Sequence, residues 1–316
     1  MSATVGSAMA ARSLPASVAR MRRPRPIELM LLAVIVLWSL NITVTRYILT
    51  HGFEPLAYAT VRYGLAAAVF LAITLVAERT LHVARRDWWL VGVAALVLWL
   101  NQLAFVFALD TTSASTIGLL LGATPIFAAL LGLGLGTERP SARFWLGSAV
   151  SFGGVALVGL GAGGEIDGGT EGVVLGVATA ATWAAYSVAI APLMRRYSPY
   201  RISALVLSLG WVAIAATGAR ATADQELGVG WDVWLLLIFA TLGPLVTTNV
   251  LWFRSLDRIG PARATLAANL QPFVAAVVAL VLLSESMTLP QVAGGVLIGG
   301  GIVLARRPRG APLPAE

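Results

Sequence analysis

The sequence contains no cysteine and no lysine, and it has few charged residues of any kind. Without cysteine, disulfides, thiolate metal sites and cysteine nucleophiles are all excluded. Only 12% of the residues are charged, whereas a soluble domain usually carries about a quarter. Since 58% of the residues are apolar, more than a soluble core needs, we expect the excess to face lipid.

Histidine and acidic residues are also missing from the places where an enzyme would need them. The two histidines, His51 and His82, fall in predicted loops, and no Asp or Glu lies in the middle of a predicted span. Catalysis needs a nucleophile, a base or a metal, so we expect no enzyme, no metal site and no cofactor. The absence of a mid-span carboxylate leaves facilitated diffusion open and weakens proton coupling, which would have to use an end-of-helix acid such as Asp110 or Glu285.

Ten apolar runs reach or approach the roughly 20 residues that a transmembrane helix needs. They predict an all-α membrane protein whose spans are joined by short connections. The predicted spans lie near 27–47, 55–77, 88–108, 113–136, 143–161, 172–194, 201–219, 232–253, 262–284 and 288–305.

Arginine placement predicts the orientation in a cell (inner) membrane. Apart from Arg46, Arg62 and Arg220, all arginines lie in the two terminal tails and in alternate connections between spans. Positive charge stays cytoplasmic, so we expect a disordered cytoplasmic tail at 1–26 and a second cytoplasmic tail at 307–316. The same placement accounts for the net charge of +7 without a nucleic-acid partner.

The sequence repeats itself at a spacing of 147 residues. Pro125 corresponds to Pro272, Glu138 to Glu285, and the paired glycines that begin at Gly153 to those that begin at Gly300. The repeat is five helices long, and because five is odd, the two copies must be inserted in opposite orientations. We predict two inverted repeats, at 27–161 and 172–306, joined by an external linker at 162–171.

Several of these motifs together resemble a known family. Trp-Ser-Leu-Asn at 38–41, Leu-Asp-Thr-Thr-Ser at 109–113, Pro125, Glu138 and the glycines of the fifth span are similar to the drug/metabolite transporter superfamily, in its EamA-type ten-helix branch. The resemblance implies a carrier, often an exporter, of small metabolites such as amino acids. It also implies a central cavity lined mainly by spans 1, 3, 4, 6, 8 and 9.

Polar and aromatic side chains recur inside those same spans. Polar groups are costly in lipid, so they are expected to face a cavity or the bundle interior. Trp, Tyr and amide side chains suit a mostly apolar pocket that orients a small polar solute; the alternative is hydrogen bonding between helices. The predicted substrate-binding residues are Trp38, Asn41, Asn101, Gln102, Thr124, Trp183, Tyr186, Thr248, Asn249, Asn269 and Gln271.

Two prolines and one arginine inside spans carry separate hypotheses. Pro125 and Pro272 each remove a helical hydrogen bond, which predicts paired hinges or cavity-lining bends, or else static kinks. Arg62 lies about two turns inside the second span. It is either a contact for an anionic group, or a side chain that reaches the interface or bonds to carbonyls and Tyr63.

We therefore expect a secondary transporter, an exporter, that moves small metabolites by alternating access. The alternatives are a translocase of anionic or lipid-linked compounds that uses Arg62, and a membrane scaffold that transports nothing. The expected partners are a small-molecule substrate and the lipid bilayer. The chain is either a monomer or a homodimer, because its GxxxG motifs, such as the one at 118–122, allow close helix contact.

Overall fold

The computed structural model shows a helical bundle. Every regular element in the part of the chain that it describes is a helix. The described residues are 26–112, 114–161, 163, 169–283 and 287–305; the predicted tails at 1–26 (except Pro26) and 307–316, most of the linker at 162–171, and Glu285 lie outside them.

The first half of the chain forms six α-helices and one short 3-10 helix. Most of their bounds agree with the predicted spans to within three residues, but the fourth span is divided into two helices. The elements are α1 (Pro26–Thr50), α2 (Pro55–Ala77), η1 (Arg85–Asp87), α3 (Trp88–Thr111), α4 (Ala114–Leu121), α5 (Thr124–Gly134) and α6 (Ala142–Gly161).

The second half begins with two long helices, and two of its predicted spans are interrupted. One contains a π-helical segment, η2, and the other is divided at residues 269–270. The elements are α7 (Gly169–Met194), α8 (Pro199–Thr217), α9 (Ala219–Ala223), α10 (Trp231–Thr241), η2 (Leu242–Thr247), α11 (Thr248–Ile259), α12 (Pro261–Ala268), α13 (Gln271–Leu283) and α14 (Leu289–Ala305).

Proline marks several helix starts. Proline is one of the first two residues of α2, α5, α8 and α12, where its missing N–H costs nothing and its fixed φ suits a helix. At α8 the Ser198 hydroxyl also accepts a hydrogen bond from the Arg201 backbone N–H, which satisfies one more of the free donors of the first turn.

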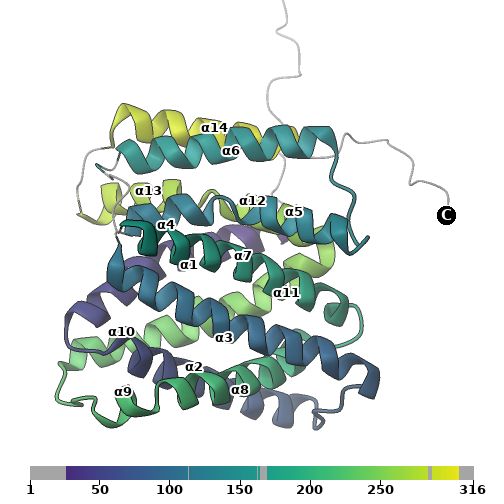
Figure 1. Cartoon of the computed structure of the whole chain (residues 1–316), viewed down its shortest axis with the longest axis vertical. Helices are drawn as coiled ribbons and strands as arrows, with labels where there is room; N and C mark the ends of the chain where they lie inside the picture. Colours follow the sequence, from purple (N-terminus) through teal and green to yellow (C-terminus); the bar gives the residue numbers. More distant parts are fainter. Residues whose placement is uncertain (1–25, 113, 162, 164–168, 284–286, 306–316) are drawn as a thin grey trace, which may run out of the picture.

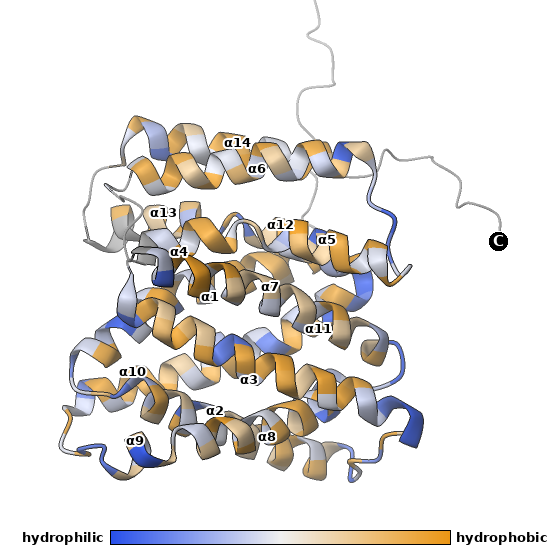
Figure 2. Cartoon of the chain, in the orientation of Figure 1, coloured by the Kyte–Doolittle hydropathy of each residue, from blue (hydrophilic) through white to orange (hydrophobic). Residues whose placement is uncertain are grey.

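The helices are apolar enough to form a multi-pass membrane protein. Eight helical segments of the described chain are long and apolar enough to cross a bilayer. Figure 2 shows hydrophobic residues along the helices and hydrophilic ones mainly at their ends and in the connections. The remaining two predicted spans correspond to α12 with α13, which is interrupted, and to α14, which has 17 residues.

Helices α6 and α14 pack along each other at one edge of the bundle, and α2 packs on α8 at the opposite edge (Figure 1). Glycines allow the α6–α14 backbones to touch. A Cβ atom on Gly147 would lie 2.5 Å from the Gly301 carbonyl oxygen, and one on Gly154 would lie 2.6 Å from that of Gly294. Because the contact at Gly147 uses the later residue of α14, the two helices are antiparallel.

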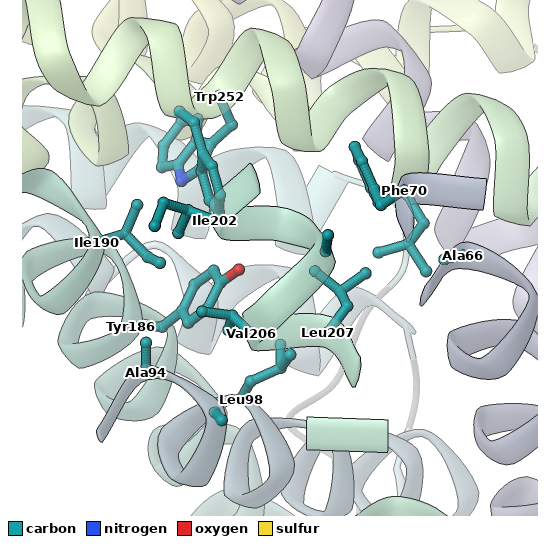
Figure 3. Packing of buried hydrophobic residues seen from close by; sticks show 14 of the residues in the cluster. Ala66, Phe70, Ala94, Leu98, Tyr186, Ile190, Ile202, Val206, Leu207 and Trp252 are labelled. Carbon is teal, nitrogen blue, oxygen red and sulfur yellow. The ribbon is translucent and has the colours of Figure 1, made fainter. Parts of the chain in front are cut away.

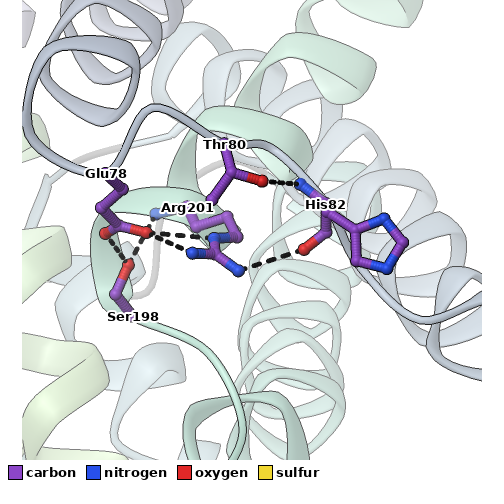
Figure 4. Close-up of polar contacts among 5 residues, drawn as sticks. All are labelled: Glu78, Thr80, His82, Ser198 and Arg201. Atoms are coloured by element: carbon purple, nitrogen blue, oxygen red, sulfur yellow. Dashed lines mark hydrogen bonds and ion pairs between the residues drawn. The ribbon is translucent and has the colours of Figure 1, made fainter.

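One end of the bundle carries most of the arginines that the structure describes. This arginine-rich end comprises the connections 78–87, 135–141 and 195–198 together with Gly260, and it lies on the right in Figure 1. Charged contacts join two of its connections. Arg201 donates to the Glu78 carboxylate at 2.8–3.0 Å and to the His82 carbonyl (Figure 4), and Arg196 pairs with Asp87.

The largest hydrophobic cluster lies mainly between α2, α3, α7, α8 and α11. Figure 3 shows Trp252 and Tyr186 on opposite sides of Ile202, with Leu207 to the right of Tyr186 and Leu98 below it. Trp252 has no exposed surface and Tyr186 has 1%. This dense packing fixes the aromatic side chains that reach from the core toward the centre of the bundle.

Candidate functional site

Two of the predicted spans break near the middle, and the breaks face each other. Between α4 and α5 the helix stops at Gly122, and between α12 and α13 it stops at Asn269. The Asn269 side-chain amide donates to the Gly122 carbonyl at 3.1 Å and to the Ser151 hydroxyl at 3.2 Å. Broken helices leave backbone carbonyls without helical donors, and here one break supplies a donor to the other.

Each break is followed by proline. Pro125 and Pro272 are the second residues of α5 and α13, so each proline begins a new helix rather than bending a continuous one. Pro125 cannot donate to the Leu121 carbonyl, which accepts instead from the Thr124 hydroxyl at 2.6 Å. Pro272 borders the central cavity and Pro125 does not.

A third proline determines the position of Arg62. Pro244 lies in the π-helical segment η2 and cannot donate to the carbonyl of Ala240, four residues earlier. Arg62 replaces the missing donor with its Nε and Nη2 atoms, at 3.3 and 3.1 Å. Nη2 also donates to the Asn41 side-chain oxygen at 3.0 Å, and the guanidinium lies 5.6 Å from the Tyr58 ring centroid.

Aromatic side chains form one wall of the site. Trp38 lies edge-on to Trp183, with ring centroids 5.3 Å apart, and 4.9 Å from Trp252; Trp183 is 5.3 Å from Tyr186. The Trp38 indole donates to the Thr248 hydroxyl at 3.1 Å. Edge-on and tilted aromatic pairs are favourable arrangements, so this wall is a fixed surface.

Amide side chains join the helices around this wall. Asn101 donates to the Thr179 carbonyl at 2.9 Å, and Gln102 donates to the Asn101 oxygen. Asn249 donates to Ser203 on α8 at 3.2 Å. Gln271 donates to the Trp38 carbonyl at 3.2 Å. The interhelical hydrogen bonds that the sequence left as an alternative are therefore present at residues that also line a cavity.

Most of the side chains described above border one cavity of about 360 Å³, although Trp252, Ser203 and Tyr58 do not. It brings together the eleven predicted substrate-binding residues and Arg62, which come from α1, α2, α3, α5, α7, α11, α12–α13 and the breaks between them. The sequence did not single out several other lining residues. They are short hydroxyl side chains, the proline of η2, and a glutamine near the start of α14: Ser39, Thr43, Thr179, Thr265, Pro244 and Gln291.

Arg62 is the one permanently charged side chain among the described residues that line the cavity. It is 5% exposed, so its charge is almost completely removed from bulk water. No group of three or more His, Cys, Asp or Glu side chains that could hold a metal ion occurs in the described part of the chain.

The bundle is packed differently at its two ends. At the arginine-rich end, α5 lies along α12, whereas the described residues of the other halves of the same two spans, α4 and α13, make few contacts with each other. Glu138, just after α5, completes the closed side. If residue 260 had a Cβ atom, that atom would lie 2.5 Å from Oε1 of Glu138. The φ of +79° at Gly260 also favours glycine at this position.

Comparison with known proteins gives consistent results. The model of the EamA-like transporter family matches residues 25–160 and again 170–307. The uncharacterized transporter YdeK of Bacillus subtilis is 27% identical over 86% of this chain and 94% of its own length. An uncharacterized transporter of Archaeoglobus fulgidus is 26% identical over 84% of this chain and 92% of its own.

A further relative and a solved structure extend the comparison. A probable terminal-alkyne amino-acid exporter of Streptantibioticus cattleyicolor is 30% identical over 61% of this chain and 64% of its own length. One crystal structure superposes with a TM-score of 0.71, covering 88% of this chain and 96% of that chain at 21% identity, which shows a shared fold. With its family model matched in both halves, the chain belongs to the EamA-like transporter family of the drug/metabolite transporter superfamily.

Proposed function

We propose that this protein is a secondary transporter that exports small metabolites, amino acids among them, by alternating access. The observation that carries the proposal is a polar and aromatic cavity inside an apolar bundle whose helices α5 and α12 pack together at the arginine-rich end. A carrier needs a binding site that is open to one side of the membrane at a time. Discontinuous helices around such a site are a recurrent feature of secondary transporters.

The proposed membrane topology has ten spans in two inverted halves. Eight helical segments qualify as spans. In the proposed topology, α12 together with α13 forms a further span, and α14 forms the tenth. The two matches to the family model support two equivalent halves. In the 147-residue repeat, Gly147 corresponds to Gly294 and Gly154 corresponds to Gly301. The contact of Gly147 with Gly301 is therefore equivalent to the contact of Gly294 with Gly154, as an inverted pseudo-two-fold axis requires.

The arginine-rich end is proposed to be cytoplasmic, since positively charged connections stay on that side. In this conformation α5 and α12 pack together at the proposed cytoplasmic end, and residues of α4 and α13 line the cavity. These contacts support a state that is closed to the cytoplasm and open to the other side. Transport then requires α5 and α12 to separate and α4 and α13 to close. Inverted halves can exchange conformations in this manner because each is nearly the equivalent of the other.

Single cysteines can test this proposal directly, because the natural sequence has none. Ala276→Cys places a thiol on the cavity wall, and Ala262→Cys places one in the closed α5–α12 contact. In proteoliposomes of known orientation, we expect an impermeant maleimide to label position 276 from outside and position 262 only from the arginine-rich side. Labelling of position 262 must increase when transport is started by a substrate gradient.

Alternating access would be contradicted if the cysteine at position 262 is never labelled from the arginine-rich side during turnover, while the cysteine at position 276 is still labelled from outside. That result would favour a scaffold without transport. The second candidate, a translocase of anionic or lipid-linked compounds, is favoured by the buried charge of Arg62. It predicts transport of compounds with an anionic head group and no transport of neutral analogues.

A further inference from the structure

Two connections at the arginine-rich end are held together by acidic residues. Asp87 pairs with Arg196 and accepts a hydrogen bond from the Tyr197 hydroxyl at 2.7 Å. Glu78 pairs with Arg201 at 2.8 Å. These are the only two acidic residues in the α2–α3 and α7–α8 connections. Both carboxylates are therefore neutralised inside the protein.

The two ion pairs leave four other arginines of these connections without an acidic partner. They are Arg79, Arg85, Arg86 and Arg195, all of which are exposed. None of the ion pairs in the described part of the chain involves any of the four. Because the contacts above join the two connections, the four charges lie on one continuous surface, and a surface with one sign of charge attracts ligands of the other.

Two exposed tryptophans continue this surface toward the membrane. Trp88 and Trp89 are the first residues of α3 and are 42% and 65% exposed. Because the helical segment Arg85–Thr111 is long and apolar enough to cross a bilayer, we expect its first residues to lie at the membrane boundary, where tryptophan is enriched. We call the following side chains the basic aromatic patch: Arg79, Arg85, Arg86, Trp88, Trp89 and Arg195.

The opposite end of the bundle joins its connections without such a surplus of charge. The α1–α2 and α8–α10 connections occupy the equivalent places in the proposed inverted repeat. There Gln225 accepts from the Glu54 backbone N–H at 2.8 Å and donates to the Gly52 carbonyl at 2.9 Å. The one arginine of these two connections, Arg220, is paired with Asp224. An amide is therefore enough to join such connections.

The positive-inside rule accounts for arginines at the arginine-rich end, but not for four unpaired ones beside two exposed tryptophans. A ligand that fits this surface has an anionic group for the arginines and an apolar part that lies in the membrane beside the tryptophan rings. An anionic phospholipid has both, and basic clusters next to a transmembrane helix recognise such lipids.

We propose that the basic aromatic patch binds the headgroup of an anionic phospholipid, such as phosphatidylglycerol, from the adjacent leaflet. The lipid phosphate accepts hydrogen bonds from the guanidinium groups, whose planar donors match phosphate oxygens. The acyl chains extend into the bilayer along α3, beyond Trp88 and Trp89. The lipid is then a partner that binds outside the central cavity, and its binding does not depend on the transport function.

The melting temperature of the full-length protein in a nonionic detergent tests this proposal, because a ligand that binds the native state raises it. Dioleoyl phosphatidylglycerol is compared with dioleoyl phosphatidylcholine, which has the same chains and no net charge. Glycerol phosphate is the third compound, since it carries the phosphate without the chains. We expect only phosphatidylglycerol to raise the melting temperature clearly, and to do so less in about 0.5 M salt, which screens exposed charges.

Variants matched in charge then assign the effect to the patch. Arg85→Gln combined with Arg86→Gln should need at least tenfold more phosphatidylglycerol for half of the stabilisation, a difference of about 1.4 kcal/mol. Arg254→Gln combined with Arg258→Gln is the control. It removes the same charge from exposed positions of α11 outside the patch, and it should stay close to wild type.

A further variant separates the patch from a diffuse effect of charge. Trp89→Ala leaves the net charge unchanged and removes the more exposed of the two rings, so it should also weaken the response to phosphatidylglycerol.

The proposal is overturned if phosphatidylcholine or glycerol phosphate stabilises the protein as much as phosphatidylglycerol does. It is also overturned if the two double variants lose the response equally, or if Trp89→Ala retains it in full. The comparison of the three compounds uses the wild-type protein, so it decides even if a variant fails to fold. No transport is measured, so these outcomes leave the proposed function untouched.

Discussion

At the scale of single residues, the site depends on side chains that satisfy backbone groups freed by helix breaks. Asn269 joins two breaks through the Gly122 carbonyl and the Ser151 hydroxyl, and it is 4% exposed. A buried polar group that loses its partner costs about 1–3 kcal/mol. These residues therefore stabilise the cavity as well as line it.

Asn269→Leu should destabilise the protein, because it leaves the Gly122 carbonyl and the Ser151 hydroxyl without this donor. The expected loss is about 1–3 kcal/mol, measured as a lower midpoint of thermal unfolding in detergent. Thr50→Ala is the control, since the exposed Thr50 hydroxyl bonds within α1 and to the adjacent His51. Equal midpoints for Asn269→Leu and wild type would show that the break does not depend on this side chain.

The cavity residues could be predicted from the sequence, but their partners could not. Trp183, Asn249 and Gln271 stood out because polar and amphipathic side chains are rare in mid-span. The contact of Arg62 with the Ala240 carbonyl depends on Pro244, 182 residues away, and nothing in the local sequence of either indicates it. Trp252 was not singled out, because a tryptophan near a span end usually lies at the membrane interface.

At the scale of helices, packing indicates which pairs we expect to stay together and which we expect to separate during transport. Helices α6 and α14 are in backbone contact through Gly147, Gly154, Gly294 and Gly301, so sliding or opening would break many contacts at once. We expect this pair to be a static part of the bundle. Helices α5 and α12 meet over the short length of their own half-spans, so we expect them to be the pair that separates.

Gly154→Ala should destabilise the protein, whereas Gly153→Ala should not. A Cβ atom on Gly154 would be 2.6 Å from the Gly294 carbonyl oxygen and 2.8 Å from the Ile298 nitrogen, whereas one on Gly153 has no atom within 4 Å. Overpacking costs about 1–3 kcal/mol, while alanine in place of an open helical glycine gains about 0.5–1 kcal/mol. Unfolding midpoints of the two neighbours in the same detergent check this, and a reversed order would contradict the close α6–α14 packing.

We expect closure of the arginine-rich end to depend on pH through Glu138. Burial raises the pKa of this carboxyl above its usual 4.5, and the nearby Ala262 backbone and Arg263 charge offset only part of the effect. A raised pKa means that the closed state binds the proton more tightly than an open state with exposed Glu138. Closure is therefore strongest below about pH 4.5 and weakens as pH rises through the raised pKa.

Labelling of Ala262→Cys from the arginine-rich side should therefore increase with pH. Glu138→Gln, which cannot ionise, should make that labelling independent of pH, while Glu226→Gln, at a residue outside this contact, should leave the wild-type profile unchanged. The profile must be corrected for thiolate formation with an exposed reference cysteine. If Glu138→Gln retains the wild-type pH profile, another group controls the closure.

The spans could be predicted from hydropathy, but their interruptions could not. The bounds of α2 agree with the predicted 55–77, because charged or polar residues flank an unbroken apolar run. Residues 113–136 and 262–284 give equally continuous hydropathy, and the prolines there predicted bends. That α4 and α12 end before those prolines follows from contacts between distant residues, such as Asn269 with Gly122. The same holds for η2, whose π-helical turn depends on what packs against it.

At the scale of the whole molecule, the proposed topology depends on two weak spans, α12 with α13 and α14. Helix α14 has 17 residues, about 25 Å, which is less than the roughly 30 Å of a bilayer core. It is antiparallel to α6, however, and contacts it from Gly147 to Gly161, where Gly161 accepts from Thr288 at the start of α14. Because α6 is long and apolar enough to cross, we expect α14 to cross with it.

Ten spans place both termini on one side of the membrane, and the loss of either weak span would separate them. We expect reporters fused before residue 1 and after residue 316 both to be protected from external protease in intact cells. A reporter inserted at residue 163, between α6 and α7, is the control and should be cleaved. An accessible C-terminal reporter would mean an odd number of spans, and two inverted five-helix halves could not then be correct.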